Sequence, residues 1–87
     1  MEALHFDETV VNFIPKGINL LFPNLKVLDI WKCGLLKISK TDLDGFEQLQ
    51  VLSLGYNQLH SIPNDLFDDM KNLKAIFLIG NPIEYMS

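Results

Sequence analysis

Three residues of this chain carry side chains that could support nucleophilic chemistry: Cys33, His5 and His60. A thiol becomes a strong nucleophile when a neighbouring base lowers its pKa or removes its proton. Both histidines stand far from Cys33 in the sequence, and the three residues lack the close spacing of zinc ligands. No glycine-rich phosphate loop is present either. We therefore expect no catalytic centre, no metal site and no cofactor.

Three carboxylates, Asp65, Asp68 and Asp69, gather in the second half of the chain. Carboxylate oxygens are the ligands that Ca²⁺ takes in proteins, so a weak calcium site is one interpretation of this cluster. A solvent-exposed acidic loop is the other interpretation, and it needs no ligand. We favour the exposed loop.

The composition indicates one small folded domain and argues against nucleic acid as its partner. The 87 residues are 48% hydrophobic and carry a formal net charge of −4. There is no arginine, the residue that reads bases and phosphates by paired hydrogen bonds. No apolar run approaches the roughly 20 residues of a membrane-spanning helix. The single cysteine cannot form an internal disulfide, and no secretion signal is visible at the N-terminus.

Apolar residues recur along the chain with a spacing of 24 residues. This spacing is the signature of a repeat protein. Within each unit the pattern is LxxLxLxx(N/C)xLxxI, and Leu4, Phe6, Val11 and Ile14 extend it towards the N-terminus. The matching positions are Phe22, Phe46 and Met70; Leu25, Leu49 and Leu73; Leu28, Leu52 and Ile76; Ile30, Leu54 and Leu78; Leu35, Leu59 and Ile83.

The repeat resembles the leucine-rich repeats, in particular the 24-residue form whose second half reads IPxxxF. That motif appears here as Ile62, Pro63 and Phe67. The resemblance implies an α/β solenoid: an arc with a short parallel sheet on its concave side and loops or 3₁₀ turns on its convex side. The expected organisation is a single domain, with a partial unit at 1–21, full units at 22–45 and 46–69, and a truncated unit at 70–87.

The last two leucines of LxxLxL alternate as a strand requires, so each unit is expected to contribute one strand with both leucines facing the interior. The expected strands are Ala3 to Asp7, Lys26 to Trp31, Gln50 to Gly55 and Lys74 to Ile79.

One column of the repeat holds Thr9, Cys33, Asn57 and Asn81. In the family that these repeats resemble, the asparagine amide bonds backbone groups of neighbouring turns, and a buried asparagine is tolerable only when it is bonded. Cys33 occupies the same position, and a small, weakly polar thiol can fill it. We therefore expect Cys33 to be a buried structural residue and not a nucleophile.

The strand residues that alternate with the buried leucines form what we call the outer sheet face, which the resemblance makes concave. Its expected binding residues are His5, Asp7, Asp29, Trp31, Ser53, Tyr56, Phe77 and Ile79. Aromatic side chains beside charged ones are typical of binding hot spots. Alternatively, the aromatic residues pack on one another across the strands. We favour binding.

The expected function is therefore non-enzymatic binding of a protein partner through the concave outer sheet face. The resemblance implies a role like that of recognition and adhesion proteins, including innate immune receptors and insect immune factors, and it favours an extracellular location. The alternative is a self-assembling unit or a piece of a larger receptor. Partly exposed apolar residues in the first and last units, Ile14 and Ile76 among them, would then join two copies as a homodimer, as would the outer sheet face.

Overall fold

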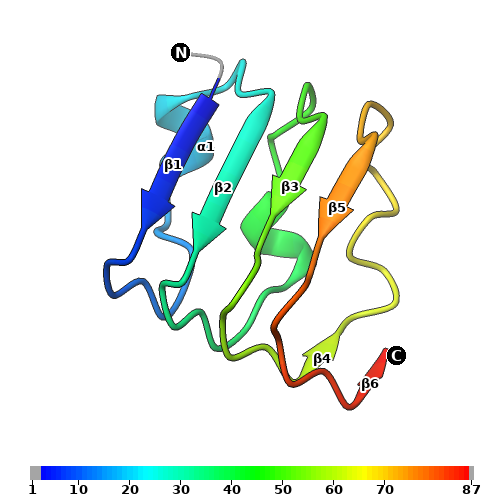
Figure 1. The fold of residues 1–87 in the computed structure, drawn as a ribbon. Coiled ribbons are helices and arrows are strands. Elements are labelled where there is room, and N and C mark those ends of the chain that lie inside the picture. The colour runs from blue at the N-terminus through cyan, green and yellow to red at the C-terminus, as the bar shows by residue number, and fades with distance from the viewer. Residues whose placement is uncertain (1–2, 87) are drawn as a thin grey trace.

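Four strands lie side by side in one parallel sheet (Figure 1). The computed structural model describes residues 3–86, so residues 1, 2 and 87 of the first and last expected units lie outside the described part. The sheet is built from β1 (Ala3–Asp7), β2 (Val27–Trp31), β3 (Val51–Ser53) and β5 (Ala75–Phe77), in that order. The expected parallel sheet is confirmed.

The pairing register follows the repeat, because each strand pairs with residues 24 positions further along the chain. Leu28 lies opposite Leu4 on one side and opposite Leu52 on the other. Strands β3 and β5 are shorter than the sequence predicts. Their backbone pairing nevertheless continues beyond them, since the Tyr56 amide donates to the Ile79 carbonyl at 2.8 Å.

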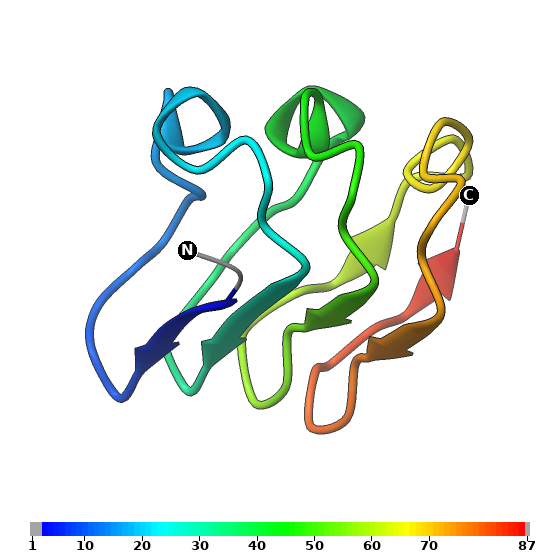
Figure 2. The same cartoon turned by 90° about the horizontal axis from the view of Figure 1, so that it is seen from above.

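The chain returns from each strand on the opposite side of the molecule, where Figure 2 shows short helices and turns. These include α1 (Ile18–Leu21) and the 3₁₀ helix η1 (Lys40–Leu43). A second small sheet, which the sequence did not predict, pairs β4 (Ser61–Ile62) with β6 (Tyr85–Met86). No helix within residues 3–86 has the length and apolar character needed to cross a membrane.

The core consists of the repeated apolar positions of the two middle units. The residues whose exposure is 0% are Leu25, Leu28, Ile30, Leu35, Leu52, Leu54 and Leu59. Their equivalents in the outer units are less covered: Leu4, Phe6 and Val11 are half-buried, and Ile76 is 37% exposed. The expectation for Ile14 was wrong, because it is only 5% exposed and belongs to the same buried cluster as Ile18 of α1.

The chain leaves every strand of the main sheet through one residue in the left-handed conformation. The four residues are Glu8, Lys32, Tyr56 and Gly80, with φ of 53°, 55°, 55° and 78°. Only glycine adopts this conformation without a steric penalty, and three of the four are not glycine. The fold therefore imposes the turn on whichever side chain occupies this position, and it aims the Lys32 and Tyr56 side chains across the end of the sheet.

Candidate functional site

Strand alternation determines which side chains form the outer sheet face. In β1 and β2 the residues Leu4, Phe6, Leu28 and Ile30 enter the core, so the residues between them point outward. The register brings these outward residues together across the strands. His5 lies opposite Asp29, Asp29 opposite Ser53, Ser53 opposite Phe77, and Asp7 opposite Trp31.

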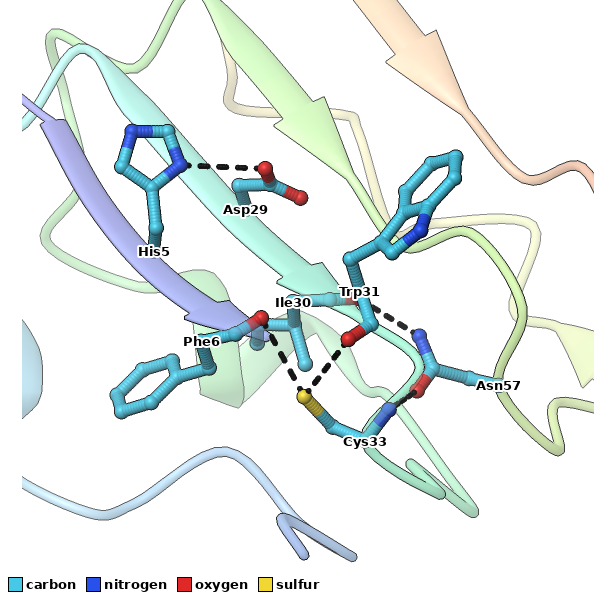
Figure 3. Close-up of polar contacts among 7 residues, drawn as sticks. All are labelled: His5, Phe6, Asp29, Ile30, Trp31, Cys33 and Asn57. Carbon is cyan, nitrogen blue, oxygen red and sulfur yellow. Dashed lines mark hydrogen bonds and ion pairs between the residues drawn. The ribbon is translucent and has the colours of Figure 1, made fainter. Parts of the chain in front are cut away.

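One half of the outer sheet face is acidic. His5 Nδ1 lies 3.1 Å from Asp29 Oδ2, and Lys32 Nζ lies 3.9 Å from Glu8 Oε1 (Figure 3 draws the first pair). The Asp7 side chain is exposed. The second oxygen of Asp29, Oδ1, is buried and has no hydrogen-bond partner among the described residues. This half therefore retains carboxylate oxygens that can accept further hydrogen bonds.

The other half of the outer sheet face is aromatic and apolar. The rings of Trp31 and Tyr56 meet edge to face, with centroids 5.0 Å apart and an interplanar angle of 68°. Lys32 Nζ lies 5.9 Å from the centre of the Tyr56 ring, a cation–π distance. Phe77 and Ile79 remain 51% and 61% exposed. Packing between aromatic residues thus accounts for Trp31 and Tyr56, and it leaves the surfaces of Phe77 and Ile79 free.

The rings of Trp31 and Tyr56 occupy space that is open because two residues of the neighbouring units are glycines. A β-carbon built on Gly55 would lie 2.4 Å from the benzo ring of Trp31, and one built on Gly80 would lie 2.4 Å from the Tyr56 ring. Such distances are too short for real atoms, so each aromatic ring lies in the space that a side chain of the next unit would fill. Trp31 and Tyr56 therefore lean in the same direction along the sheet.

The structure corrects the expectation for Ser53, which was placed among the exposed binding residues. Ser53 is only 9% exposed. Its neighbours in the register, Asp29 and Phe77, carry larger side chains that shield the small serine. The hydroxyl therefore lies at the base of the outer sheet face and not on its rim.

The turns that follow the strands are held by a buried asparagine. Asn57 is 1% exposed, and its Oδ1 accepts hydrogen bonds from the amides of Cys33 (2.9 Å) and Leu35 (3.1 Å). Its Nδ2 donates to the carbonyls of Ile30 and Leu54, both at 2.8 Å. One side chain thereby satisfies backbone groups of two successive turns.

Asn81 and Cys33 occupy the equivalent positions of the neighbouring turns. Asn81 accepts from the Leu59 amide at 3.1 Å and donates to the Leu54 carbonyl at 2.8 Å. The thiol of Cys33 reaches the carbonyls of Phe6 (3.3 Å) and Trp31 (3.2 Å), as Figure 3 shows. Cys33 thus makes the donor contacts of an asparagine. The fourth residue of the column, Thr9, is exposed.

Comparison with known proteins agrees with this geometry. A family model described as "Leucine rich repeat" matches residues 23–83, which is more than half of the chain. The chain belongs to the leucine-rich repeat family. This leucine-rich repeat chain is 31% identical over 83 residues to leucine-rich repeat-containing protein 66 of Homo sapiens, covering 95% of the chain and 9% of that relative.

Two further relatives cover this leucine-rich repeat chain to different extents. Leucine-rich repeat-containing G-protein coupled receptor 5 of Rattus norvegicus is 29% identical over 83 residues, which are 95% of the chain and 9% of the receptor. Adenylate cyclase of Schizosaccharomyces pombe is 40% identical over 47 residues, which are 54% of the chain and 3% of the cyclase. The chain thus spans less than a tenth of the length of these relatives.

Cys33, His5 and His60, the potential nucleophile and bases of the leucine-rich repeat chain, each contact different groups. His5 contacts Asp29, His60 Nδ1 lies 3.7 Å from Glu84 Oε1, and the Cys33 thiol contacts backbone carbonyls. Within the described residues, no group of three His, Cys, Asp or Glu side chains is arranged to hold a metal ion. The residues that the sequence marked as chemically versatile are therefore not brought together.

The acidic cluster of the return side takes part in an ion pair. Lys40 donates a hydrogen bond to Asp69, and this bond, together with the attraction between the charges, raises the pKa of Lys40 and lowers the pKa of Asp69. Asp65 and Asp68 of the same cluster are exposed. The pair joins η1 to the next turn of the chain.

Burial of Cys33 makes its thiol a test of the repeat register. The side chain is 3% exposed and unpaired, so we expect a chromogenic aromatic disulfide reagent to modify it only slowly in the native protein. In denaturant the same reagent should modify one thiol per chain at once. Rapid stoichiometric reaction without denaturant would place Cys33 on the surface and contradict the register.

Proposed function

We propose that the chain is a short leucine-rich repeat solenoid that binds a protein partner through its concave outer sheet face, without enzymatic activity. The observation that carries this proposal is the exposure of Phe77 and Ile79 next to the Trp31–Tyr56 pair and the acidic half. A few residues, often aromatic ones, supply most of the binding free energy of protein interfaces.

The arrangement of the outer sheet face suits a protein better than a small molecule. Its side chains come from four strands and form a broad surface, apolar on one side and charged on the other. Protein interfaces combine an apolar centre with a polar rim in this way. One relative is named as a receptor, and a recognition role for this chain would agree with that name.

Truncating aromatic residues of the outer sheet face is the direct test. The variants Trp31→Ala and Phe77→Ala should each weaken binding of a purified partner by about 30-fold, which corresponds to a loss of about 2 kcal/mol at a hot spot. The partner would be obtained by affinity capture on the immobilised chain and then titrated by calorimetry. Circular dichroism should show that both variants remain folded.

Phe13→Ala is the matched control, because Phe13 is 60% exposed but lies in the loop after β1 and not on the sheet. Its affinity should equal that of the wild type. The proposal fails if Phe13→Ala weakens binding as much as Phe77→Ala. It also fails if both sheet variants bind the partner normally.

A second candidate is association between copies of the chain. The observation in its favour is that β5, an outer strand of the described sheet, carries Ile76 with 37% of its surface exposed. A homodimer through β5 or the outer sheet face would cover this surface. Sedimentation at several concentrations decides between the two candidates, since a monomer at all concentrations contradicts self-association.

A further inference from the structure

We propose that Asp7, Asp29, Trp31 and Ser53 form a subsite for an arginine side chain of the protein partner. This inference rests on the proposed function and specifies the chemistry that the partner presents. Its basis is the register of the strands, one oxygen of Asp29 that lacks a hydrogen-bond partner, and the balance of charge on the outer sheet face.

The register places two carboxylates and an aromatic ring around one point of the sheet. Asp7 lies opposite Trp31, and His5 lies opposite Asp29, which is two residues before Trp31 on the same strand. Residues in these positions share one face and stand close enough for a long side chain to reach all of them. Figure 3 shows Asp29 between the imidazole of His5 and the indole of Trp31.

One carboxylate oxygen at this point has unmet hydrogen-bonding capacity. Asp29 Oδ1 is buried without a hydrogen-bond partner among residues 3–86, while Oδ2 of the same carboxylate contacts His5. Ser53, which lies opposite Asp29 in the register, is 9% exposed and brings a hydroxyl to the same face of the sheet. Buried polar groups are nearly always bonded, so the unbonded Asp29 Oδ1 indicates a place where a donor can bind.

The local charge favours a cation. Asp7, Glu8 and Asp29 contribute three carboxylates, whereas Lys32 is the lysine that faces them, at 3.9 Å from Glu8. Asp7 has no ion-pair partner among the described residues, and its side chain is exposed. A cationic side chain of the partner would therefore complement a surface with excess negative charge.

Among cationic side chains, arginine fits this geometry better than lysine. A guanidinium is planar, presents five donors and bonds two carboxylates at once, whereas an ammonium acts as a compact point charge. The same plane can stack on an aromatic ring, and Trp31, whose indole leans over Gly55, is two residues from Asp29 on β2 and pairs with Asp7 in the register. Trp31 is partly exposed, so part of its indole surface remains open to that contact.

The test uses N-acetyl-arginine amide as the probe and the fluorescence of the wild-type chain as the signal. Trp31 is the only tryptophan, so its emission reports on this point alone. We expect a saturable change with a dissociation constant in the millimolar range. The uncharged isostere N-acetyl-citrulline amide should bind about tenfold more weakly or not at all, because it keeps the shape and lacks the charge.

Two conservative variants and one control test whether the two carboxylates bind the probe. Asp29→Asn and Asp7→Asn should each weaken binding of the arginine probe by about tenfold, a difference of about 1.4 kcal/mol in binding free energy. Asp7 is exposed and unpaired, so its variant folds even if Asp29→Asn does not. Asp68→Asn removes the same charge from the exposed return side and should leave binding unchanged.

The inference is wrong if citrulline amide binds as well as arginine amide, if no saturable change occurs, or if Asp68→Asn weakens binding as much as Asp7→Asn. These outcomes concern the subsite alone. Failure of the proposed function has a different signature: Phe77→Ala, outside the subsite, then leaves affinity for the purified partner unchanged whatever the arginine probe does.

Discussion

Replacing Asn57 with alanine is expected to lower the free energy of unfolding by about 4 kcal/mol. The substitution removes the acceptor of the Cys33 and Leu35 amides and the donor to the Ile30 and Leu54 carbonyls. A buried backbone group left without a partner costs about 1–3 kcal/mol. Because small domains are stabilised by about 5–15 kcal/mol in total, this loss would remove a large share of the stability of the chain and lower its urea midpoint strongly.

Urea denaturation followed by circular dichroism measures this effect, and Asn72→Ala is the matched control. Asn72 is exposed and bonds a single carbonyl, that of Glu47 at 2.8 Å, so its loss should cost less than about 1 kcal/mol. The loss in free energy of unfolding for Asn57→Cys should lie between those of Asn57→Ala and Asn72→Ala. A thiol can donate a hydrogen bond as Cys33 does, but it is a poor acceptor. A cost below about 1 kcal/mol for Asn57→Ala would show that water replaces these bonds.

The parallel sheet could be predicted from the sequence because its cause is local and repeated. Leu28 and Ile30 recur as Leu52 and Leu54, and both pairs are fully buried. A pattern with a constant period leaves one register in which every unit buries its leucines, and the strands adopt that register. The position of the sheet therefore follows from hydrophobic burial alone.

The turns after the strands could not be predicted in the same way. Glu8, Lys32 and Tyr56 are not residues that prefer the left-handed conformation, yet all three adopt it. The conformation is imposed by the pairing of the neighbouring strands, such as the bond from the Lys32 amide to the Gly55 carbonyl at 3.1 Å. Only Gly80 carries a signal of this conformation in its residue type.

Which side chains point outward from the sheet could be predicted from the sequence, but their exposure and contacts could not. Alternation identifies the outward residues, and Phe77 and Ile79 are exposed as that rule predicts. Exposure of an outward residue also depends on the size of its neighbours, which is why Ser53 is buried. Likewise, the residue types alone do not show that the Trp31 indole lies over Gly55, since this depends on a side-chain rotamer.

Truncating Leu52 to alanine is the second substitution with a large expected effect on stability. Leu52 is 0% exposed and lies between Leu28 and Ile76 in the register, so neighbours on both sides hold the cavity open. Truncations of buried leucine cost about 2–5 kcal/mol, and this site belongs in the upper part of that range because the flanking strands limit collapse.

The equivalent substitution at the next unit, Ile76→Ala, separates burial from residue chemistry. Ile76 occupies the same column of the repeat but is 37% exposed on an outer strand of the described sheet. Ile76→Ala should therefore lower the free energy of unfolding clearly less than Leu52→Ala does in the same urea denaturation. Leu20→Ala, at an 80% exposed position of α1, should cost about 0.5 kcal/mol or less. Equal losses for Leu52 and Ile76 would mean that the column is covered equally in solution, and therefore that another surface, such as a second copy of the chain, packs against β5.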